Sequence, residues 1–247
     1  MDLRHYGQLY VLIFLNSRLF MVNNAKYKPR FSAVLKEVVR GKSVSRTLTN
    51  LFWRGRPAIS GKILDIGGGS SGSHYRFLSF AGDAKIETVD VVERKGTTYV
   101  LDITKERVPL PDSSVDIIFL FNIIEHLASP SVTITEAHRL LKRGGKIFGS
   151  IPFLVNVHRD PEDYSRFTDT ALYALFESHG LDVEELEPIG RGPFLVAYEQ
   201  LDMLIWSPLH LLFLPIVWAL DWFITLIKPK RDFKGQFPLA YNFIIKK

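Results

Sequence analysis

Apolar and polar residues are arranged along the middle of the chain in a way that predicts strands and helices in turn. Strands are expected at residues 62–66, 85–91, 98–101, 115–121, 146–151 and 181–189. Helices are expected at residues 70–80, 132–141 and 168–179. Strands that alternate with helices at this spacing predict an α/β fold: a Rossmann-like, doubly wound sheet whose strands are mostly parallel.

The N-terminal part of the chain differs in charge from the rest. Residues 3–64 contain twelve Lys or Arg and one acidic residue, Glu37, whereas the remaining residues are net acidic although the whole chain carries +5. Apolar residues between Leu12 and Val22 recur at helical spacing, and basic residues follow them. This pattern predicts an amphipathic helix at a membrane interface with a basic arm, or else a helix packed on the domain.

The amino-acid composition excludes several kinds of chemistry. The chain of 247 residues has no cysteine, which excludes disulfides, a thiolate nucleophile and thiolate zinc sites. Hydrophobic residues make up 47% of the chain, enough for one α/β core with apolar extensions.

A glycine-rich turn follows the first expected strand. Residues 62–72, KILDIGGGSSG, contain a G-x-G-x-x-G that begins at Gly67, a pattern found in dinucleotide sites. Asp90 follows at about the 20-residue distance at which such sites carry an acid. Asp65 stands directly before the glycines, where it would repel a pyrophosphate and favour a cation, and Asp102 adds a third carboxylate. An anionic turn suits S-adenosylmethionine, which carries a sulfonium and an ammonium group.

Five sequence segments resemble one family in order and spacing. The chain from about residue 62 to 180 is similar to the class I S-adenosylmethionine-dependent methyltransferases of the type 11 small-molecule group. The matching segments are ILDIGGG (63–69), VD (89–90), LDI (101–103), PLPDSSVDIIFLFNIIEHL (109–127) and LLKRGGKIFGSIP (140–152). The chain departs from the family at Ser70-Ser71-Gly72, where the family commonly has its third glycine earlier.

The resemblance implies a cofactor site at the carboxyl ends of the first four strands. The amino-acid end of S-adenosylmethionine would lie against the glycines and the ribose against Asp90, while Asp102 and Ile103 would face the adenine. The expected cofactor-binding residues are Asp65, Gly67, Gly68, Gly69, Asp90, Val91, Asp102, Ile103 and Asn122.

Two histidines are the candidate catalytic residues. His126 follows the fourth strand and could act as a general base toward a hydroxyl acceptor, or could orient its loop. His158 belongs to VHRDPEDYSRFT (157–168), which resembles an H-x-x-P-x-D-Y-x-R-F-T element of methyltransferases in bacterial glycan and lipid-linked pathways. That resemblance makes Tyr164 and Arg166 candidate substrate-binding residues, with Arg166 able to hold an anion. No metal is expected, because acidic loops of this kind are more often solvated.

The sequence also narrows the acceptor. The absence of cysteine excludes cytosine methylation through a thiolate adduct. The residues after the fourth strand, Phe121-Asn122-Ile123-Ile124, lack the N-P-P-aromatic motif, which disfavours amino methylation of bases and a nucleic-acid partner.

Residues 203–227 form a very apolar stretch with Asp221 as its one formal charge. One helix of this length would measure about 37 Å, more than the roughly 30 Å hydrocarbon core of a bilayer. Residues 238–247 resemble the family's last strand, which pairs antiparallel within the same sheet as the strand expected at 181–189. If residues 203–227 crossed the membrane once, these two strands would lie on opposite sides of it. Pro208 and Pro215 are therefore expected to break the stretch into pieces that dip into one side of a membrane. A lid or a dimer interface is the alternative.

These observations predict three parts: a basic helical extension (1–60), a methyltransferase domain (61–192 and 236–247) and an apolar, membrane-dipping helical insertion (193–235). The expected function is methyl transfer to a lipid, isoprenoid or lipid-linked glycan, at oxygen, on the cytoplasmic face of a membrane whose surface is anionic. The alternatives are a methyltransferase for a soluble glycan or small molecule, with the insertion as a lid or dimer contact, and an inactive methyltransferase-like binding protein.

Overall fold

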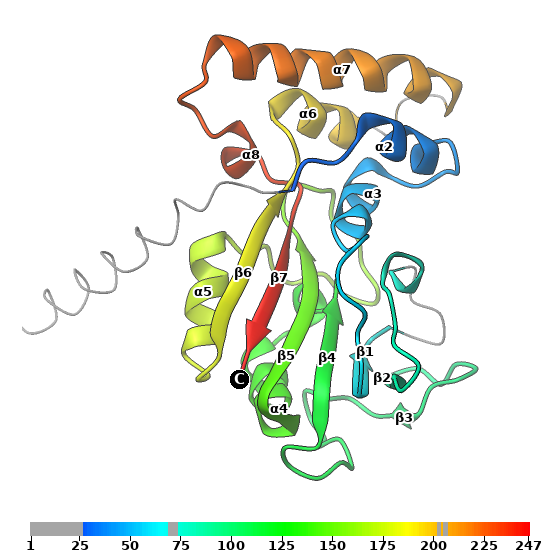
Figure 1. Ribbon diagram of the computed structural model, residues 1–247, viewed down its shortest axis with the longest axis vertical. Helices are drawn as coiled ribbons and strands as arrows, with labels where there is room; N and C mark the ends of the chain where they lie inside the picture. The colour runs from blue at the N-terminus through cyan, green and yellow to red at the C-terminus, as the bar shows by residue number, and fades with distance from the viewer. Residues whose placement is uncertain (1–26, 69–73, 202–203, 205–206) are drawn as a thin grey trace, which may run out of the picture.

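A seven-stranded sheet forms the centre of the computed structural model, which describes residues 27–68, 74–201, 204 and 207–247 (Figure 1). The strands lie in the order β3-β2-β1-β4-β5-β7-β6, and only β7 is antiparallel to its neighbours. Their bounds are β1 Lys62–Ile66, β2 Lys85–Asp90, β3 Tyr99–Val100, β4 Val115–Phe121, β5 Leu141–Pro152, β6 Asp182–Ile189 and β7 Ala240–Lys246. The predicted fold class and the antiparallel last strand are confirmed.

Helices cover both faces of the sheet. The α-helices are α2 Phe31–Val38, α3 Val44–Leu51, α4 Pro130–Leu140, α5 Asp169–Glu177, α6 Pro193–Leu201, α7 Ser207–Ile227 and α8 Phe233–Gln236, and 3₁₀ turns lie at η1 Tyr75–Phe77 and η2 Ile124–His126. Apolar side chains of α4 and α5, among them Ile134 and Phe176, are buried in the larger core cluster with β4, β5 and β7. On the other face Trp53 stacks on Phe148 at 5.4 Å and meets Phe121 edge-on. Large apolar side chains buried on both faces stabilise the parallel strands.

A helical cap, which we define as α2, α6, α7 and α8, sits at the carboxyl end of the parallel strands (Figure 1). The chain forms α2 before the first strand, and it returns to the cap after β6 and leaves it before β7, two strands that pair from Ile189 opposite Ala240. The cap and α3 share a second core cluster with β7, in which Val34, Leu195 and Leu214 are fully buried. The cap is therefore packed onto the sheet at the end where ligands bind in folds of this kind.

The helix expected at residues 70–80 is not present in the described residues. Residues 69–73 lie outside them, and after them only η1 is helical, followed by a single parallel bridge between Phe80 and Ile59. His74 and Tyr75 turn their side chains toward Asp65 beneath the turn, and the chain extends after Leu78 to pair with residue 59. The amphipathic helix expected near Leu12 also lies outside the described residues.

From Ser207 to Ile227 the apolar stretch is one continuous helix, α7, so the prediction that Pro215 breaks it is wrong. A proline inside a helix removes one backbone hydrogen bond, and α7 keeps its course because its inner side is held by buried Leu214 and Asp221. Pro208 stands in the first turn, where a backbone N–H has no partner within the helix anyway. Within the described part of the chain, none of the helices combines the length and the apolar character needed to cross a bilayer.

Candidate functional site

The strand order reverses between β1 and β4, and the candidate site lies at the carboxyl ends of these two strands. Two glycines follow β1. Gly67 has φ +74°, and a Cβ there would lie 2.0 Å from Cδ1 of Ile123. A Cβ on Gly68 would lie 1.9 Å from Oδ2 of Asp65. A Cβ at either position would displace a neighbouring side chain, and the positive φ of Gly67 disfavours other residues as well, so bare backbone faces the end of the strand; Gly69 lies outside the described residues.

Asp65 is fully buried at the carboxyl end of β1. The Tyr75 hydroxyl donates to its Oδ2 at 2.5 Å, and Nε2 of His74 lies 3.3 Å from the same oxygen. Burial first, and the Asp65 charge second, raise the pKa of Tyr75 far above its usual range. Oδ1 of Asp65 has no hydrogen-bond partner in the described residues. His74 and Tyr75 were not predicted as site residues; their place directly after the glycine-rich turn is the only sequence signal for them.

Two more carboxylates lie after the next strands. Asp90, 8% exposed at the end of β2, accepts from the Val92 N–H at 2.9 Å and lies 3.4 Å from Arg94. Asp102 follows β3 and accepts from Thr104 and from Lys105 at 2.7 Å. The hydrogen bond from Lys105, and then that from Thr104, lower the pKa of Asp102 below its usual value.

The predicted neighbours of these carboxylates lie on the same edge. Val91 is exposed next to Asp90, while Ile103 is buried next to Asp102. Asn122 directly follows β4 in a left-handed conformation, φ 53°, and its Oδ1 accepts from the Ser150 hydroxyl at 2.9 Å. The carboxyl ends of β1 to β4 thus present carboxylates, an amide and bare backbone along one edge of the sheet, which we call the carboxylate edge.

A second group of side chains follows β4. Glu125 and His126 in η2 meet His158 from the loop after β5, and their ligand-type atoms all lie within 4.8 Å of one another. Nε2 of His126 is 3.7 Å and Nε2 of His158 is 3.9 Å from Oε1 of Glu125. Glu125 is fully buried, and burial raises its pKa to about 8. The two histidines singled out separately in the sequence therefore belong to one cluster, whereas Glu125 was not predicted.

The loop that carries His158 is held by an ion pair. Arg166 donates two hydrogen bonds to Asp163, and Oδ2 of Asp163 accepts from the His158 backbone N–H at 2.9 Å. These hydrogen bonds, that from Arg166 first, lower the pKa of Asp163 to about 2. Arg166 therefore fixes the loop. Tyr164 is 57% exposed and anchors the same loop through its N–H, which donates to the Glu125 carbonyl at 2.8 Å.

A cavity of about 460 Å³ opens beside this cluster, between the sheet edge and the cap. His158, Asn122 and Asn156 line it on the sheet side, and Lys42 and Arg46 line it on the side of α3. The cluster thus borders a space in which an acceptor could lie next to the carboxylate edge.

The residues at the carboxylate edge fit S-adenosylmethionine. Asp65 offers a buried carboxylate oxygen without a partner, and Gly67 and Gly68 leave no Cβ to keep a ligand from the backbone. A cationic ligand suits these carboxylates far better than a pyrophosphate does.

Comparison with known proteins identifies the domain. Residues 64–149 match the family model described as a methyltransferase domain. The chain carries a class I S-adenosylmethionine-dependent methyltransferase domain. A probable S-adenosylmethionine-dependent methyltransferase of Mycolicibacterium smegmatis is 33% identical over 90 residues, which are 34% of this chain and 35% of the relative. An uncharacterized protein of Methanocaldococcus jannaschii is 29% identical over 112 residues, 43% of this chain and 54% of the relative. The matches thus span about half or less of these relatives' length.

Solved structures share the fold of the methyltransferase domain. An S-adenosylmethionine-dependent methyltransferase from Archaeoglobus fulgidus superposes with a TM-score of 0.51 at 18% identity, covering 88% of this chain and 100% of that one. The [4+2]-cyclase SpnF superposes equally well, 0.51 at 14% identity, over 86% and 92% of the two chains. The same fold therefore occurs in a protein named for a different reaction, so the acceptor chemistry must be argued from the site.

Within the methyltransferase domain, the structure brings the predicted residues into two neighbouring groups. Along the carboxylate edge lie the predicted cofactor-binding residues Asp65, Gly67, Gly68, Asp90, Val91, Asp102, Ile103 and Asn122. The cluster beside the cavity contains His126 and His158. S-adenosylmethionine is the cofactor of the domain. The individual roles of these residues stay predictions.

Proposed function

We propose that this protein transfers a methyl group from S-adenosylmethionine to an oxygen atom of an amphipathic acceptor at an anionic membrane surface. The acceptor is a lipid, an isoprenoid compound or a lipid-linked glycan. The proposal joins three features: the carboxylate edge, the cavity beside it, and an exposed apolar face on α7. The last of these carries the choice of acceptor.

The cofactor supplies an activated methyl group on a positively charged sulfur. Asp65, Gly67 and Gly68 would receive its amino-acid end, and Asp90 would accept from the ribose hydroxyls. Asp102 and Ile103 would face the adenine. Most of the rate enhancement would come from alignment of the acceptor with the methyl group, which can contribute about 7–11 kcal/mol.

The acceptor oxygen would stand in the cavity, against His158 and Asn122. In the transfer, the oxygen forms a bond to the methyl carbon, the carbon–sulfur bond breaks and its electron pair stays on sulfur. The acceptor's hydroxyl proton leaves to water in the cavity. Lys42 and Arg46 on the cavity wall suit an acceptor that carries a negatively charged group such as a phosphate.

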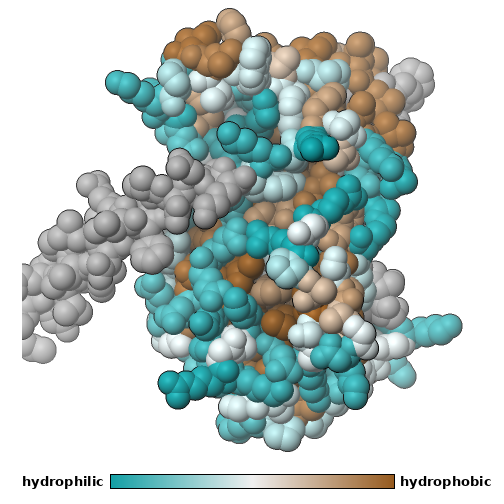
Figure 2. Space-filling view, in the orientation of Figure 1, coloured by the Kyte–Doolittle hydropathy of each residue, from teal (hydrophilic) through white to brown (hydrophobic). Residues whose placement is uncertain are grey.

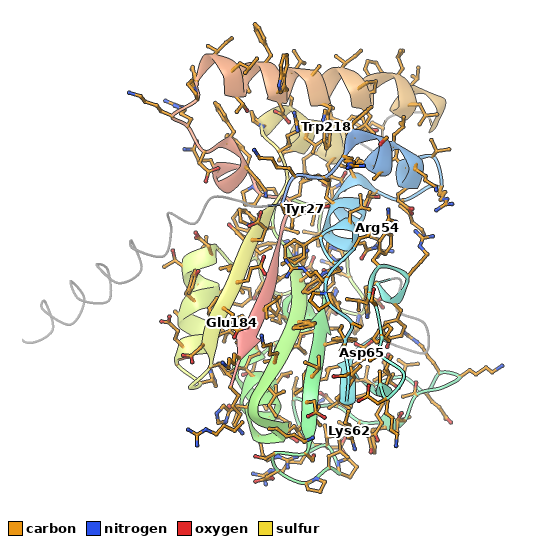
Figure 3. All side chains as sticks on the ribbon, in the orientation of Figure 1. Tyr27, Arg54, Lys62, Asp65, Glu184 and Trp218 are labelled. Atoms are coloured by element: carbon orange, nitrogen blue, oxygen red, sulfur yellow. The ribbon has the colours of Figure 1, made fainter. Side chains whose placement is uncertain are left out.

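The exposed face of α7 is the observation that supports a membrane. Ten large apolar side chains of this helix are at least 38% exposed: Leu209, Leu211, Leu212, Phe213, Ile216, Leu220, Trp222, Phe223, Leu226 and Ile227. The opposite side of the helix is held by the protein, since Leu214 and Asp221 are buried and Trp218 packs on Phe31 at 5.4 Å (Figure 3). Figure 2 shows brown, hydrophobic surface along this end of the molecule. Exposed apolar patches of this extent mark interaction sites.

The surroundings of this face favour a lipid surface. Lys228, Lys230 and Arg231 follow the helix directly and are exposed, where they can meet anionic headgroups. Trp222 lies among the exposed residues, and tryptophan is enriched at membrane interfaces. Because α7 is continuous, it would lie flat in the interface, with the cavity on the protein side of the cap.

Flotation with lipid vesicles tests the membrane part. The full chain should float with vesicles that contain phosphatidylserine and much less with phosphatidylcholine vesicles. Leu212→Glu with Phe223→Glu should reduce binding at least tenfold, because each buried side chain of this size contributes about 1.5–3 kcal/mol. Val132→Glu, at an apolar position on α4 that is 43% exposed, is the matched control and should bind as the wild type does. If the protein does not float and sediments as a dimer formed through α7, the exposed face of α7 binds a second copy of the chain and not a membrane.

Calorimetry with S-adenosylmethionine tests the catalytic part separately. Asp90→Ala should abolish detectable binding of the cofactor. Unchanged affinity would remove Asp90 from the site, and a wild-type protein that binds no S-adenosylmethionine would favour the inactive binding protein.

A further inference from the structure

We propose that Glu125, His126 and His158 bind a divalent first-row transition-metal ion. The three side chains converge from η2 and from the loop after β5, with their ligand-type atoms within 4.8 Å of one another. Two imidazoles and one carboxylate are a donor set that such ions take in proteins.

The hydrogen bonds of the two imidazoles fix which nitrogen is free. Nδ1 of His126 is 2.5 Å from the Glu162 carbonyl oxygen, and Nδ1 of His158 is 3.2 Å from that of Asn156. A carbonyl oxygen only accepts, so each Nδ1 carries the hydrogen and, in the neutral ring, each Nε2 keeps its lone pair. Both Nε2 atoms face Glu125. Histidines that bind metals are oriented in this way, with the second nitrogen donating to a carbonyl or carboxylate.

Glu125 is the independent observation that points to a ligand. Its side chain is fully buried, and neither carboxylate oxygen has a hydrogen-bond partner on another of the described residues; the one backbone donor near it is its own N–H. The nearby cation, Arg166, donates two hydrogen bonds to Asp163 and none to Glu125. Two imidazole lone pairs and an unpartnered carboxylate therefore meet without a donor between them. A buried carboxylate is costly unless it takes up a proton or a cation compensates it, and a metal ion bound by both imidazoles would be such a cation.

The ligand atoms lie somewhat farther apart than they would around a bound ion. Ligands about 2.1 Å from a tetrahedral ion are about 3.4 Å apart. Nε2 of His126 and Nε2 of His158 lie 3.7 and 3.9 Å from Oε1 of Glu125, and all three ligand atoms lie within 4.8 Å of one another, so the ligands must draw closer when an ion binds. Glu125 cannot move toward solvent, whereas the His158 side chain is 46% exposed and can adjust.

Three protein ligands leave open coordination positions, and His158 borders the cavity assigned to the acceptor. If the proposed function holds, the ion would bind the acceptor's hydroxyl oxygen, orient it toward the methyl group and make its proton easier to lose. The histidines would then act as ligands in place of general bases. The acceptor class narrows accordingly to compounds with a hydroxyl that can bind a metal ion.

Titration with Co²⁺ tests the site without any activity measurement. Full-length protein is freed of metal with a chelator and titrated with Co²⁺, while visible ligand-field absorption and heat are recorded. One ion per chain should bind and produce a new absorption band. His158→Ala and Glu125→Gln should each weaken binding by more than the roughly 10–100-fold that loss of an outer-shell partner costs.

His179→Gln is the matched control, since this histidine lies after α5, away from the cluster, and should leave Co²⁺ affinity unchanged. His158 is half-exposed, so its variant is expected to fold even if Glu125→Gln does not. Absence of the band in the wild type, or equal affinity in wild type and His158→Ala, would overturn the proposal. Calorimetry with S-adenosylmethionine on the same samples shows separately whether the cofactor site is intact.

Discussion

Two fully buried carboxylates stand near the ends of adjacent strands, and their surroundings differ. Asp65 at the end of β1 receives a hydrogen bond from the Tyr75 hydroxyl, whereas Glu125 after β4 receives none from another of the described residues. A buried acid with a partner is compensated by its own chain, while a buried acid without one must hold a proton or bind a cation. The comparison teaches that the carboxylate edge is largely preformed, whereas the cluster of Glu125, His126 and His158 lacks a partner for its carboxylate.

The largest expected effect is that of Gly68→Ala. The new Cβ would lie 1.9 Å from the Asp65 carboxylate, so the buried acid or the turn must move. We expect at least a hundredfold loss of S-adenosylmethionine affinity in calorimetry, while Co²⁺ binding persists. Gly82→Ala, with nothing within 4 Å of its Cβ, is the control and should bind the cofactor normally. Equal affinity in both variants would show that the turn does not face the cofactor.

Opposite changes in stability should separate the two carboxylates. Tyr75→Phe removes the partner of Asp65 and should lower the free energy of unfolding by about 1–3 kcal/mol. Glu125→Gln should leave the metal-free protein as stable as the wild type or raise its stability, because an amide can donate to the free Nε2 atoms of the histidines. Urea unfolding of the metal-free proteins measures both changes. A large loss of stability in Glu125→Gln would mean that the carboxylate is already compensated.

A smaller effect is expected from Arg166→Lys. Lysine cannot form the paired hydrogen bonds that Arg166 makes to Asp163, so the loop that carries His158 should loosen. Co²⁺ affinity should fall by about 10–100-fold and S-adenosylmethionine affinity should stay within error. If cofactor binding falls instead, Arg166 affects the carboxylate edge, and this edge is coupled to the cluster of Glu125, His126 and His158.

The smallest effect is expected at the exposed rim. Lys105→Ala removes the ammonium group that pairs with Asp102, but this lysine is 77% exposed and its charge is screened by water. Cofactor affinity should change by less than about threefold in calorimetry. A larger change would mean that Lys105 itself contacts the ligand.

The strands of the fold could be predicted because their apolar runs are bounded by glycines and turns; the expected segment 115–121 coincides with β4. The course of α7 could not, because a proline counts as a helix breaker in sequence, and the packing of Leu214 and Asp221 that holds the helix is not visible there. The cap over the carboxyl end of the sheet also depends on contacts between segments far apart in the chain.

The candidate site was predicted in part for similar reasons. Asp65, Gly67 and Gly68 stand in a local motif, and the structure gives each glycine a reason to be there. The cluster depends on residues 125, 126 and 158 meeting in space and on hydrogen bonds at Nδ1, which no spacing in the sequence reveals. Arg166 was expected to hold an anion from a ligand, and in the structure it pairs with Asp163.

Methyl transfer into membrane lipid is the most direct test of the proposed function. Purified full-length protein is incubated with membranes and methyl-labelled S-adenosylmethionine, and the label is then partitioned between organic solvent and water. We predict label in the organic phase with the wild type and none with Asp90→Ala. Label that appears only in the aqueous phase, or equally with both proteins, would contradict transfer to a lipid-like acceptor at this site.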